Sequence, residues 1–286
     1  MATQARLGDS KRMHRTIFFI SDGTGITAEA IGHSLLSQFQ DLKLDQVRIP
    51  FVDSMEAAHA AVTRINKTAD KDGVRPIVIN TVVAKEVGEV LSDSNGFVLD
   101  FFATFLQALE RELGVDSSPR VGQAHGIIDS VRYEARISAT NYALSHDDGQ
   151  SPDFEQADVI LLGVSRSGKT PTCLYMALNY GIKAANYPLT EEDEGANGMM
   201  QLPKSLTPHK NKLFGLTIDA QRLAQIREAR RPGSRYASAR QCQLEVMEAE
   251  DLFRRNGISY VSTTHTSIEE ISSKVMLALG MNKTHF

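Results

Sequence analysis

The chain has 286 residues, of which 42% are hydrophobic and 23% are charged, and its formal net charge is −4. This length predicts one large or two ordinary domains, each able to bury a core. The small negative charge lacks the basic signature of a nucleic-acid-binding protein, and no apolar run reaches the ~18 residues that a membrane span needs. Cys173 and Cys242 form no disulfide or metal-binding pattern, which favours a cytoplasmic protein.

The first half alternates strand-like and helix-like segments. Residues 1–13 are polar, mixed in charge and without the apolar core of a signal peptide, so we expect a disordered tail. Strands are expected at 14–20, 47–52, 76–83 and 97–101, and helices at 28–39, 54–69, 84–91 and 103–113. This alternation predicts an N-terminal βαβ domain with a parallel sheet over 14–150. Ligands of such sheets bind beyond the carboxyl ends of the strands.

One glycine-containing turn, Ser21–Thr27, lies at such a carboxyl end, between the first strand and the first helix. Ser21, Thr24 and the backbone N–H groups of this turn could hold an anion at the helix N-terminus. A tight turn in which Thr24 or Thr27 caps the helix explains the same residues.

A polar segment follows the helix expected at 129–145. It reads His146-Asp147-Asp148-Gly149, and then Gln150-Ser151-Pro152. Because polar residues, glycine and proline cluster here, we place the domain boundary between 150 and 151. His146, Asp147 and Asp148 also have the chemistry of a general base or a metal shell. The alternative is a helix C-terminus, with His146 facing the dipole, and a solvated turn.

The most specific motif in the chain lies between an apolar strand at 159–162 and a helix at 172–180. It reads Gly163-Val164-Ser165-Arg166-Ser167-Gly168-Lys169-Thr170 and matches G-x-x-x-x-G-K-[ST] at every fixed position. The backbone N–H groups of such a loop face phosphates, and side chains at its tightest points would block them. Lys169 would reach a terminal phosphate, and the Thr170 hydroxyl would bind Mg²⁺. We therefore predict a P-loop nucleotide-binding α/β domain over 151–286.

The rest of this domain continues the alternation, with strands expected at 182–187, 212–218 and 258–262, and helices at 221–231, at 237–255 and from a capping box at Ser267. The acidic, aperiodic segment 190–208 is expected to be a loop, and beside a phosphate site it could act as a lid. Asp219 follows a strand, where a second Mg²⁺ contact often originates. It also precedes a helix that it could cap.

Six arginines fall between residues 222 and 240 and form a local basic patch. They could bind phosphates or an acidic partner. The alternative is a solvated helix face paired with nearby glutamates. The six are Arg222, Arg227, Arg230, Arg231, Arg235 and Arg240.

These motifs, in this order, resemble the family of bacterial phosphoenolpyruvate synthase regulatory proteins, sisters of the pyruvate, phosphate dikinase regulatory proteins. The resemblance extends from about Thr16 to Met281. Residues 27–29 and 37–39 are more similar to the synthase branch than to the dikinase branch. The matching segments are Ile20–Thr24, Ile26–Glu29, Gly73–Pro76, His146–Gly149, Gly163–Pro171, Ala185–Pro188, Phe214–Asp219 and Ser234–Ala237.

The resemblance implies a bifunctional serine/threonine protein kinase and phosphorylase. It implies transfer of the β-phosphoryl group of ADP to a threonine of phosphoenolpyruvate synthase, which inactivates that enzyme. It also implies the reverse switch, in which inorganic phosphate removes the group as pyrophosphate. The phosphate loop alone would suggest ATP. The resemblance further favours Ser21, Thr24, His146 and Arg235 as residues that meet phosphate or the target.

In the mechanism that we expect, residues 163–170 hold the ADP phosphates, with Lys169 on the transferred group and Thr170 placing Mg²⁺. Asp147 or Asp148 accepts the threonine proton, and Asp219 is the metal-side alternative. Arg166 lines a pocket that serves both directions. The rival functions are the same chemistry on pyruvate, phosphate dikinase, a P-loop kinase of a small metabolite, and a nucleotide-responsive binding protein without catalysis. We expect neither nucleic-acid nor membrane partners, and the sequence leaves a homodimer open.

Overall fold

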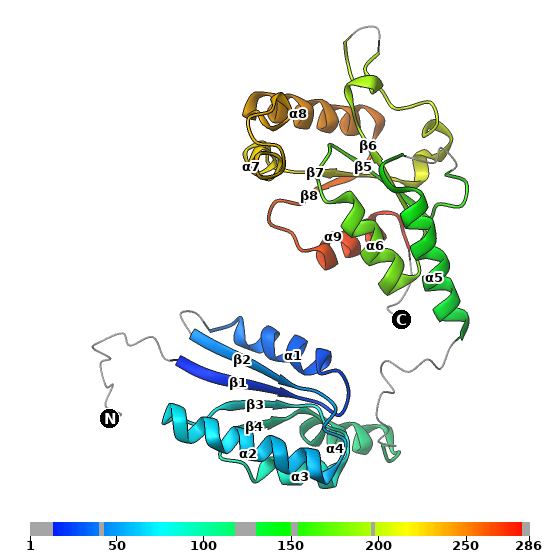
Figure 1. Ribbon diagram of the computed structural model, residues 1–286. Helices are drawn as coiled ribbons and strands as arrows, with labels where there is room; N and C mark the ends of the chain where they lie inside the picture. The colour runs from blue at the N-terminus through cyan, green and yellow to red at the C-terminus, as the bar shows by residue number, and fades with distance from the viewer. Residues whose placement is uncertain (1–13, 40–42, 118–129, 150–153, 196–197, 282–286) are drawn as a thin grey trace, which may run out of the picture. The chain divides into compact units, whose positions relative to one another are not determined.

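The computed structural model describes residues 14–39, 43–117, 130–149, 154–195 and 198–281, so the tail expected at 1–13 lies outside the described residues. The chain divides into two compact units, Met1–Gly126 and Ile127–Phe286. Each unit is built on a four-stranded sheet whose strand pairs are all parallel (Figure 1). The prediction of an α/β protein with parallel sheets is therefore confirmed.

The first unit has three layers, with helices on both faces of its sheet. Its strands follow the order β2-β1-β3-β4, and β1 is fully buried from Ile17 to Ile20 because it is central. Helices α1 and α4 pack against one face, and α2 and α3 pack against the other. The elements are β1 (His14–Ile20), α1 (Ile26–Leu36), β2 (Lys43–Ile49), α2 (Met55–Asp72), β3 (Ile77–Asn80), α3 (Lys85–Ser92), β4 (Phe97–Asp100) and α4 (Phe101–Leu113).

The second unit repeats this plan with the strand order β6-β5-β7-β8. Helices α5, α6 and α9 cover one face of the sheet, and α7 and α8 cover the other (Figure 1). Its strands and α-helices are α5 (Ser130–Ser145), β5 (Val159–Gly163), α6 (Lys169–Tyr180), β6 (Ala184–Pro188), β7 (Leu213–Thr217), α7 (Ala220–Arg230), α8 (Ala239–Asn256), β8 (Tyr260–Ser262) and α9 (Ile268–Ala278). Short 3₁₀ turns are η2 (Asp147–Gly149), η3 (Glu191–Asp193), η4 (Thr207–Lys212) and η5 (Arg235–Ala237).

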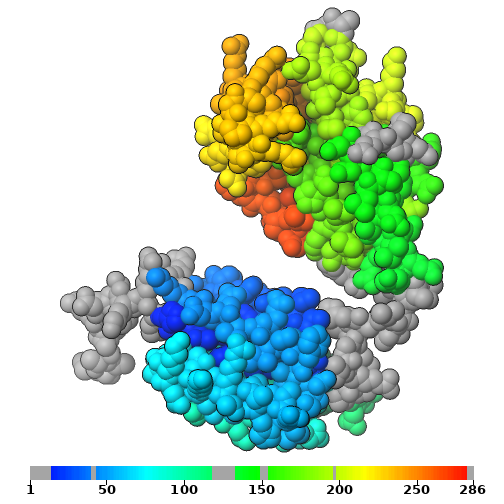
Figure 2. Space-filling model, viewed as in Figure 1, coloured from blue at the N-terminus to red at the C-terminus, as the bar shows by residue number. Residues whose placement is uncertain are grey.

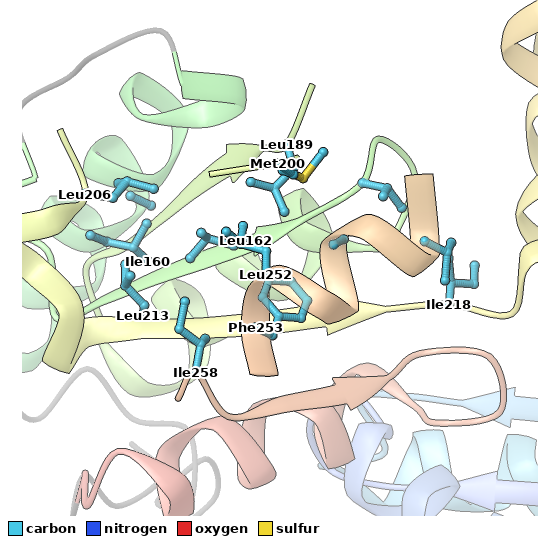
Figure 3. Close-up of a cluster of buried hydrophobic side chains, with 14 of the residues drawn as sticks. Ile160, Leu162, Leu189, Met200, Leu206, Leu213, Ile218, Leu252, Phe253 and Ile258 are labelled. Carbon is cyan, nitrogen blue, oxygen red and sulfur yellow. The ribbon is translucent and has the colours of Figure 1, made fainter. Parts of the chain in front are cut away.

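Strand β5 is the rigid base of the second unit. Every residue of β5 is buried, and Ile160 and Leu162 pack against Leu252 and Phe253 of α8 in one hydrophobic core (Figure 3). The strand order reverses beside β5, because β6 lies on one side and β7 on the other. The carboxyl end of a strand at such a reversal is where open α/β sheets bind ligands. The loop that follows β5 starts at this point.

Most observed elements begin or end a few residues from their expected bounds, and two of the differences have a clear physical reason. The division into units falls between Gly126 and Ile127, earlier than the expected 150/151, because α5 packs against α6 through Ala139 and Ala143. His146–Gly149 thus belong to a turn inside the second unit. Strand β2 begins at Lys43 and not at 47, since it is an edge strand whose polar residues can stay exposed.

Candidate functional site

The loop between β5 and α6 leaves a helix N-terminus open. Gly168 is the N-cap of α6, with φ 89°, and no side chain caps the helix. Arg166 also adopts a left-handed backbone, with φ 77°. The first N–H groups of a helix have no partner within the helix and carry the positive end of its dipole. An N-terminus without a side-chain cap, reached through a tightly turned loop, is therefore suited to bind an anion.

Gly163 sits where the loop leaves the sheet, and a side chain does not fit there. An added Cβ would lie 2.3 Å from the backbone oxygen of Leu216 and 2.8 Å from Ser167 Oγ. We expect Gly163→Ala to lower the free energy of unfolding by about 1–3 kcal/mol or more, because the backbone of β7 must shift. Urea unfolding measures this loss. Gly23→Ala is the control, since the nearest atom to its added Cβ is 3.9 Å away; equal stability of the two variants would contradict the crowding.

Lys169 is folded back onto the loop. Its Nζ donates hydrogen bonds to the backbone oxygens of Gly163 and Val164, both at 3.0 Å, and only 4% of the residue is exposed. Burial lowers the pKa of Lys169 to about 8, although the nearby negative charge of Asp148 opposes this shift. The structure therefore has a buried cation, held by two carbonyls, on the first residue of the helix whose N-terminus is open.

Two carboxylates from the turn after α5 lie beside this loop. Asp147 Oδ1 accepts a hydrogen bond from Thr170 Oγ1 at 2.7 Å and another from Asn186 Nδ2. Asn186 Oδ1 in turn accepts from the backbone N–H of Asp148 at 2.9 Å. Asn186, which is buried in β6, was not predicted as a site residue; it lies in the matching segment Ala185–Pro188, and this membership was the only signal for it.

A pocket of about 270 Å³ forms where these elements meet, and we call it the phosphate pocket. The structure thus brings Asp148 together with five of the eight loop residues expected to bind the nucleotide. Ser167 does not line the pocket, and its buried Oγ has no hydrogen-bond partner. The residues that line the phosphate pocket are Asp148, Ser165, Arg166, Gly168, Lys169, Thr170 and Pro171.

The His146 side chain packs away from the phosphate pocket and is not placed to act there as an acid or a base. Its ring stacks on the Tyr142 ring, with centroids 3.9 Å apart, and its Nδ1 lies 2.9 Å from the backbone oxygen of Tyr142. Its own backbone oxygen accepts from the N–H of Asn186 at 3.2 Å. His146 therefore ties the turn to β6 through its backbone, and it does not line the phosphate pocket.

Asp219 and Arg235 also lie outside the phosphate pocket. Asp219 Oδ1 accepts from the N–H of Arg222 at 2.9 Å, so the interpretation of Asp219 as the N-cap of α7 is confirmed. Arg235 forms an ion pair with Glu191 at 3.3 Å while remaining largely exposed. A metal role for Asp219 and a phosphate role for Arg235 stay predictions.

Ser21 and Thr24 belong to the first unit. Ser21 Oγ accepts from the N–H of Gly23 at 3.1 Å, within the turn itself. The N-cap of α1 is Gly25, with φ 82°, so the expectation that Thr24 or Thr27 caps this helix is wrong. Glycine occupies the cap because the turn needs a left-handed residue there. Anion binding by this turn remains a prediction.

Arg227 was expected in a surface patch, but its side chain is completely buried. Its Nη2 donates to the backbone oxygen of Ser165 at 3.1 Å and to Glu245 Oε2 at 2.6 Å, and its Nη1 donates to the backbone oxygen of Tyr236 at 3.0 Å. The guanidinium lies over the Tyr236 ring at 4.0 Å, and the Tyr236 hydroxyl lies 3.0 Å from Ser165 Oγ. Arg227 of α7 therefore links Glu245 of α8 to Ser165 in the loop between β5 and α6. Its position in the sequence, among other arginines, does not reveal this role.

The described residues contain no group of three or more His, Cys, Asp or Glu side chains arranged to hold a metal ion. Mg²⁺ does not need one, because it commonly uses one or two carboxylates together with water and substrate phosphates. Thr170, Asp147 and Asp148 offer the hard oxygen ligands that it prefers. None of the described helices is both long and apolar enough to span a membrane.

Comparison with known proteins identifies the family of the chain that carries this site. The model of the kinase/pyrophosphorylase family matches residues 17–276. A phosphoenolpyruvate synthase regulatory protein of Pseudomonas aeruginosa is 54% identical over 273 residues, which cover 95% of this chain and 98% of that protein. Proteins of the same description from Stutzerimonas stutzeri and Marinobacter nauticus are 53% and 52% identical over 272 residues, which cover 95% of this chain and 99% of each protein. The resemblance drawn from the motifs is confirmed, and the chain belongs to the kinase/pyrophosphorylase family.

Proposed function

We propose that this protein regulates phosphoenolpyruvate synthase as an ADP-dependent threonine kinase and a phosphate-dependent pyrophosphorylase. The family match and the description of the relatives support the reaction pair and the target. The structural observation that supports it most is the open N-terminus of α6, with Lys169 and two carboxylates beside it. A cytoplasmic location is part of this proposal.

The phosphate pocket fits the diphosphate of ADP. The N–H groups at the start of α6 favour an anion, and Lys169 and Arg166 line the same pocket. Ser167 Oγ, buried without a partner, is a further polar group at the loop. We place the P-loop nucleotide-binding domain in the second unit on these grounds. On binding, the Lys169 ammonium would release the carbonyl oxygens of Gly163 and Val164 and would donate instead to the transferred phosphoryl group.

Mg²⁺ would be held by the Thr170 hydroxyl together with Asp147, whose Oδ1 lies 2.7 Å from Thr170 Oγ1. The ion would supply charge neutralisation between the phosphates. Asn186 fixes Asp147 from the other side. Asp147 Oδ1 thus accepts two hydrogen bonds, and this residue is best suited to orient Thr170 and the metal.

Asp148 is the better candidate for the general base, because it lines the phosphate pocket. The backbone of Asp148 is left-handed, with φ 50°, and its N–H donates a hydrogen bond to Asn186 Oδ1. In the forward direction the threonine oxygen bonds to the β-phosphorus of ADP, the bond to the α–β bridging oxygen breaks, and AMP leaves. The threonine proton passes to Asp148. A positioned base contributes about 10²–10⁴-fold to such a step.

The reverse direction can use the same pocket. An oxygen of inorganic phosphate bonds to the phosphorus of phosphothreonine, the bond to the threonine oxygen breaks, and that oxygen takes back a proton from Asp148. Pyrophosphate leaves. Because the transferred phosphorus passes through the same position in both directions, Lys169 and Arg166 would stabilise both transition states.

The test is a labelling assay in both directions. Synthase carrying unlabelled phosphate on its catalytic histidine is incubated with the protein, Mg²⁺ and either β-labelled ADP or γ-labelled ATP. We expect label on a synthase threonine from ADP alone, and labelled pyrophosphate after phosphate is added. Transfer only to pyruvate, phosphate dikinase would change the target. Consumption of ATP without a protein acceptor would support a small-metabolite kinase, and ADP binding without transfer would support a binding protein.

The lowered pKa of Lys169 predicts proton uptake when a diphosphate binds. With a pKa of about 8, Lys169 is mostly neutral at about pH 9. A bound anion raises the pKa of a neighbouring lysine, since it favours the charged form. Binding at about pH 9 should therefore take up nearly one proton per site, seen by calorimetry in buffers of different ionisation enthalpy. Lys169→Met should remove this uptake, and its persistence in that variant would contradict the assignment.

A further inference from the structure

A second pocket, of about 470 Å³, lies beside the phosphate pocket, and we call it the side pocket. Ser165 lines both pockets. The side pocket is also lined by Thr190 and Glu191 from the segment after β6, and by Tyr236 of η5 and Gln241 of α8. In Figure 2 the yellow and orange segment from α7 to α8 lies beside the yellow-green segment that follows β6. The side pocket has the size of a small-molecule site, ~300–1,000 Å³.

The side pocket is rich in hydrogen-bond acceptors. Glu191 and Glu245 contribute carboxylates, and Gln241 Nε2 donates to both of them, at 3.3 Å and 3.1 Å. An adjoining pocket shares these three residues and reaches Glu248. Burial and the charges of Glu194, Glu245 and Glu191 raise the pKa of Glu248. The side pocket is also lined by Glu192, Arg227 and Arg235, and ion pairs join Arg227 to Glu245 and Arg235 to Glu191. These pairs leave the side pocket little positive charge for a phosphate, so a neutral group with N–H and O–H donors fits it better.

Arg227 adds a buried planar cation to the wall of the side pocket. Its guanidinium stacks on Tyr236, and its Nε is buried without a hydrogen-bond partner. An unsatisfied buried donor is costly unless another group meets it. The wall therefore combines an aromatic ring, an unsatisfied donor and several acceptors, which is the mixture that a heteroaromatic base can use.

We propose that the side pocket binds the nucleoside part of ADP while the phosphate loop binds the diphosphate. The inference rests on the proposed function, because it takes ADP as the ligand. The two halves of ADP match the two pockets in charge: the anionic half meets Lys169 and Arg166, and the neutral half meets the paired charges of the side pocket, Glu245 with Arg227 and Glu191 with Arg235. The exocyclic amine and the ribose hydroxyls are donors for these carboxylates, a ring nitrogen of the base is an acceptor for Arg227 Nε, and Ser165 lies at the junction.

Gln241→Trp tests this assignment, because it would place a large side chain in the side pocket, whereas Gln241 does not line the phosphate pocket. Gln243→Trp is the matched control, with the same substitution on the same helix at an exposed residue that does not line the pocket. We expect Gln241→Trp to weaken ADP binding by at least about tenfold and to leave pyrophosphate binding within about twofold of wild type, measured by calorimetry. Gln243→Trp should bind both ligands like wild type.

Wild-type ADP affinity in Gln241→Trp would overturn the inference. If ADP binding were normal but the KM for the synthase rose, the side pocket would receive the target protein. Wild type that bound pyrophosphate as tightly as ADP would also overturn it, since the nucleoside would then contribute nothing. A third outcome separates this inference from the proposed function. If Gln241→Trp selectively lost ADP binding but the wild-type protein transferred no phosphoryl group, the nucleoside site would stand and the proposed function would be refuted.

Photolabelling supplies a second readout that needs no variant. ADP carrying an azide on its base should label the wild-type protein within residues 189–194 or 235–248, which surround the side pocket. Excess ADP should prevent this labelling. Label confined to other segments, such as the turn at 263–266 after β8, would overturn the inference even if Gln241→Trp failed to fold.

Discussion

Lys169→Ala should reduce both the ADP-dependent kinase activity and the phosphate-dependent reversal by at least about 10³-fold. Phosphoryl transfer depends mainly on positioning and on charge neutralisation in a site shielded from water, where one cation is worth ~10³-fold or more. Lys169 is the buried cation of the phosphate pocket. Initial rates with β-labelled ADP, and release of pyrophosphate from phosphorylated synthase, measure the two effects.

Lys204→Ala is the matched control, because Lys204 is exposed and does not line the phosphate pocket. It should retain both rates. Circular dichroism and the urea midpoint should first establish that Lys169→Ala is folded. Normal kinase rates in a folded Lys169→Ala enzyme would show that the loop at residues 163–170 takes no part in the reaction.

Asp148→Asn and Asp147→Asn should fail in different ways, although the two residues are adjacent and the substitution is the same. Asp148→Asn should lower kcat of the kinase by about 10²–10⁴-fold with little change in ADP affinity, since it removes the proton acceptor. Asp147→Asn should chiefly raise the Mg²⁺ concentration needed for half-maximal rate, because Asp147 binds the Thr170 hydroxyl. Rates measured across a range of Mg²⁺ concentrations separate the two effects.

The opposite pattern would exchange the two roles. If Asp147→Asn lowered kcat at saturating Mg²⁺ while Asp148→Asn remained active, Asp147 would be the proton acceptor. Normal kinetics in both variants would leave Asp219 as the remaining carboxylate from the sequence prediction, and Asp219→Asn would then be measured in the same assay.

The parts of the site that depend on neighbouring residues could be predicted from the sequence. The spacing of Gly163, Gly168 and Lys169 places the loop between a buried strand and a helix, and the structure has β5 and α6 there. Strand β1 has the predicted bounds because its apolar run is central and buried. The same strong local signal explains why both parallel sheets were expected.

The parts that depend on distant residues could not be predicted. Asp147 meets Thr170 and Asn186, which are 23 and 39 residues away, and no spacing rule links them. In the sequence nothing distinguishes Arg227 from the exposed arginines near it. Its burial results from the packing of α7 against α8. The domain boundary expected at 150/151 stays a prediction; it differs from the division between Gly126 and Ile127 because a cluster of Gly and Pro marks a turn, whether or not a domain ends there.

The most direct test of the account is a crystal structure of the protein with ADP and Mg²⁺. We predict the diphosphate at residues 163–170, against the N-terminus of α6, with Lys169 Nζ moved from the carbonyls of Gly163 and Val164 to the β-phosphate. A diphosphate bound instead at the Ser21–Thr27 turn of the first unit, with Lys169 still on those carbonyls, would contradict it.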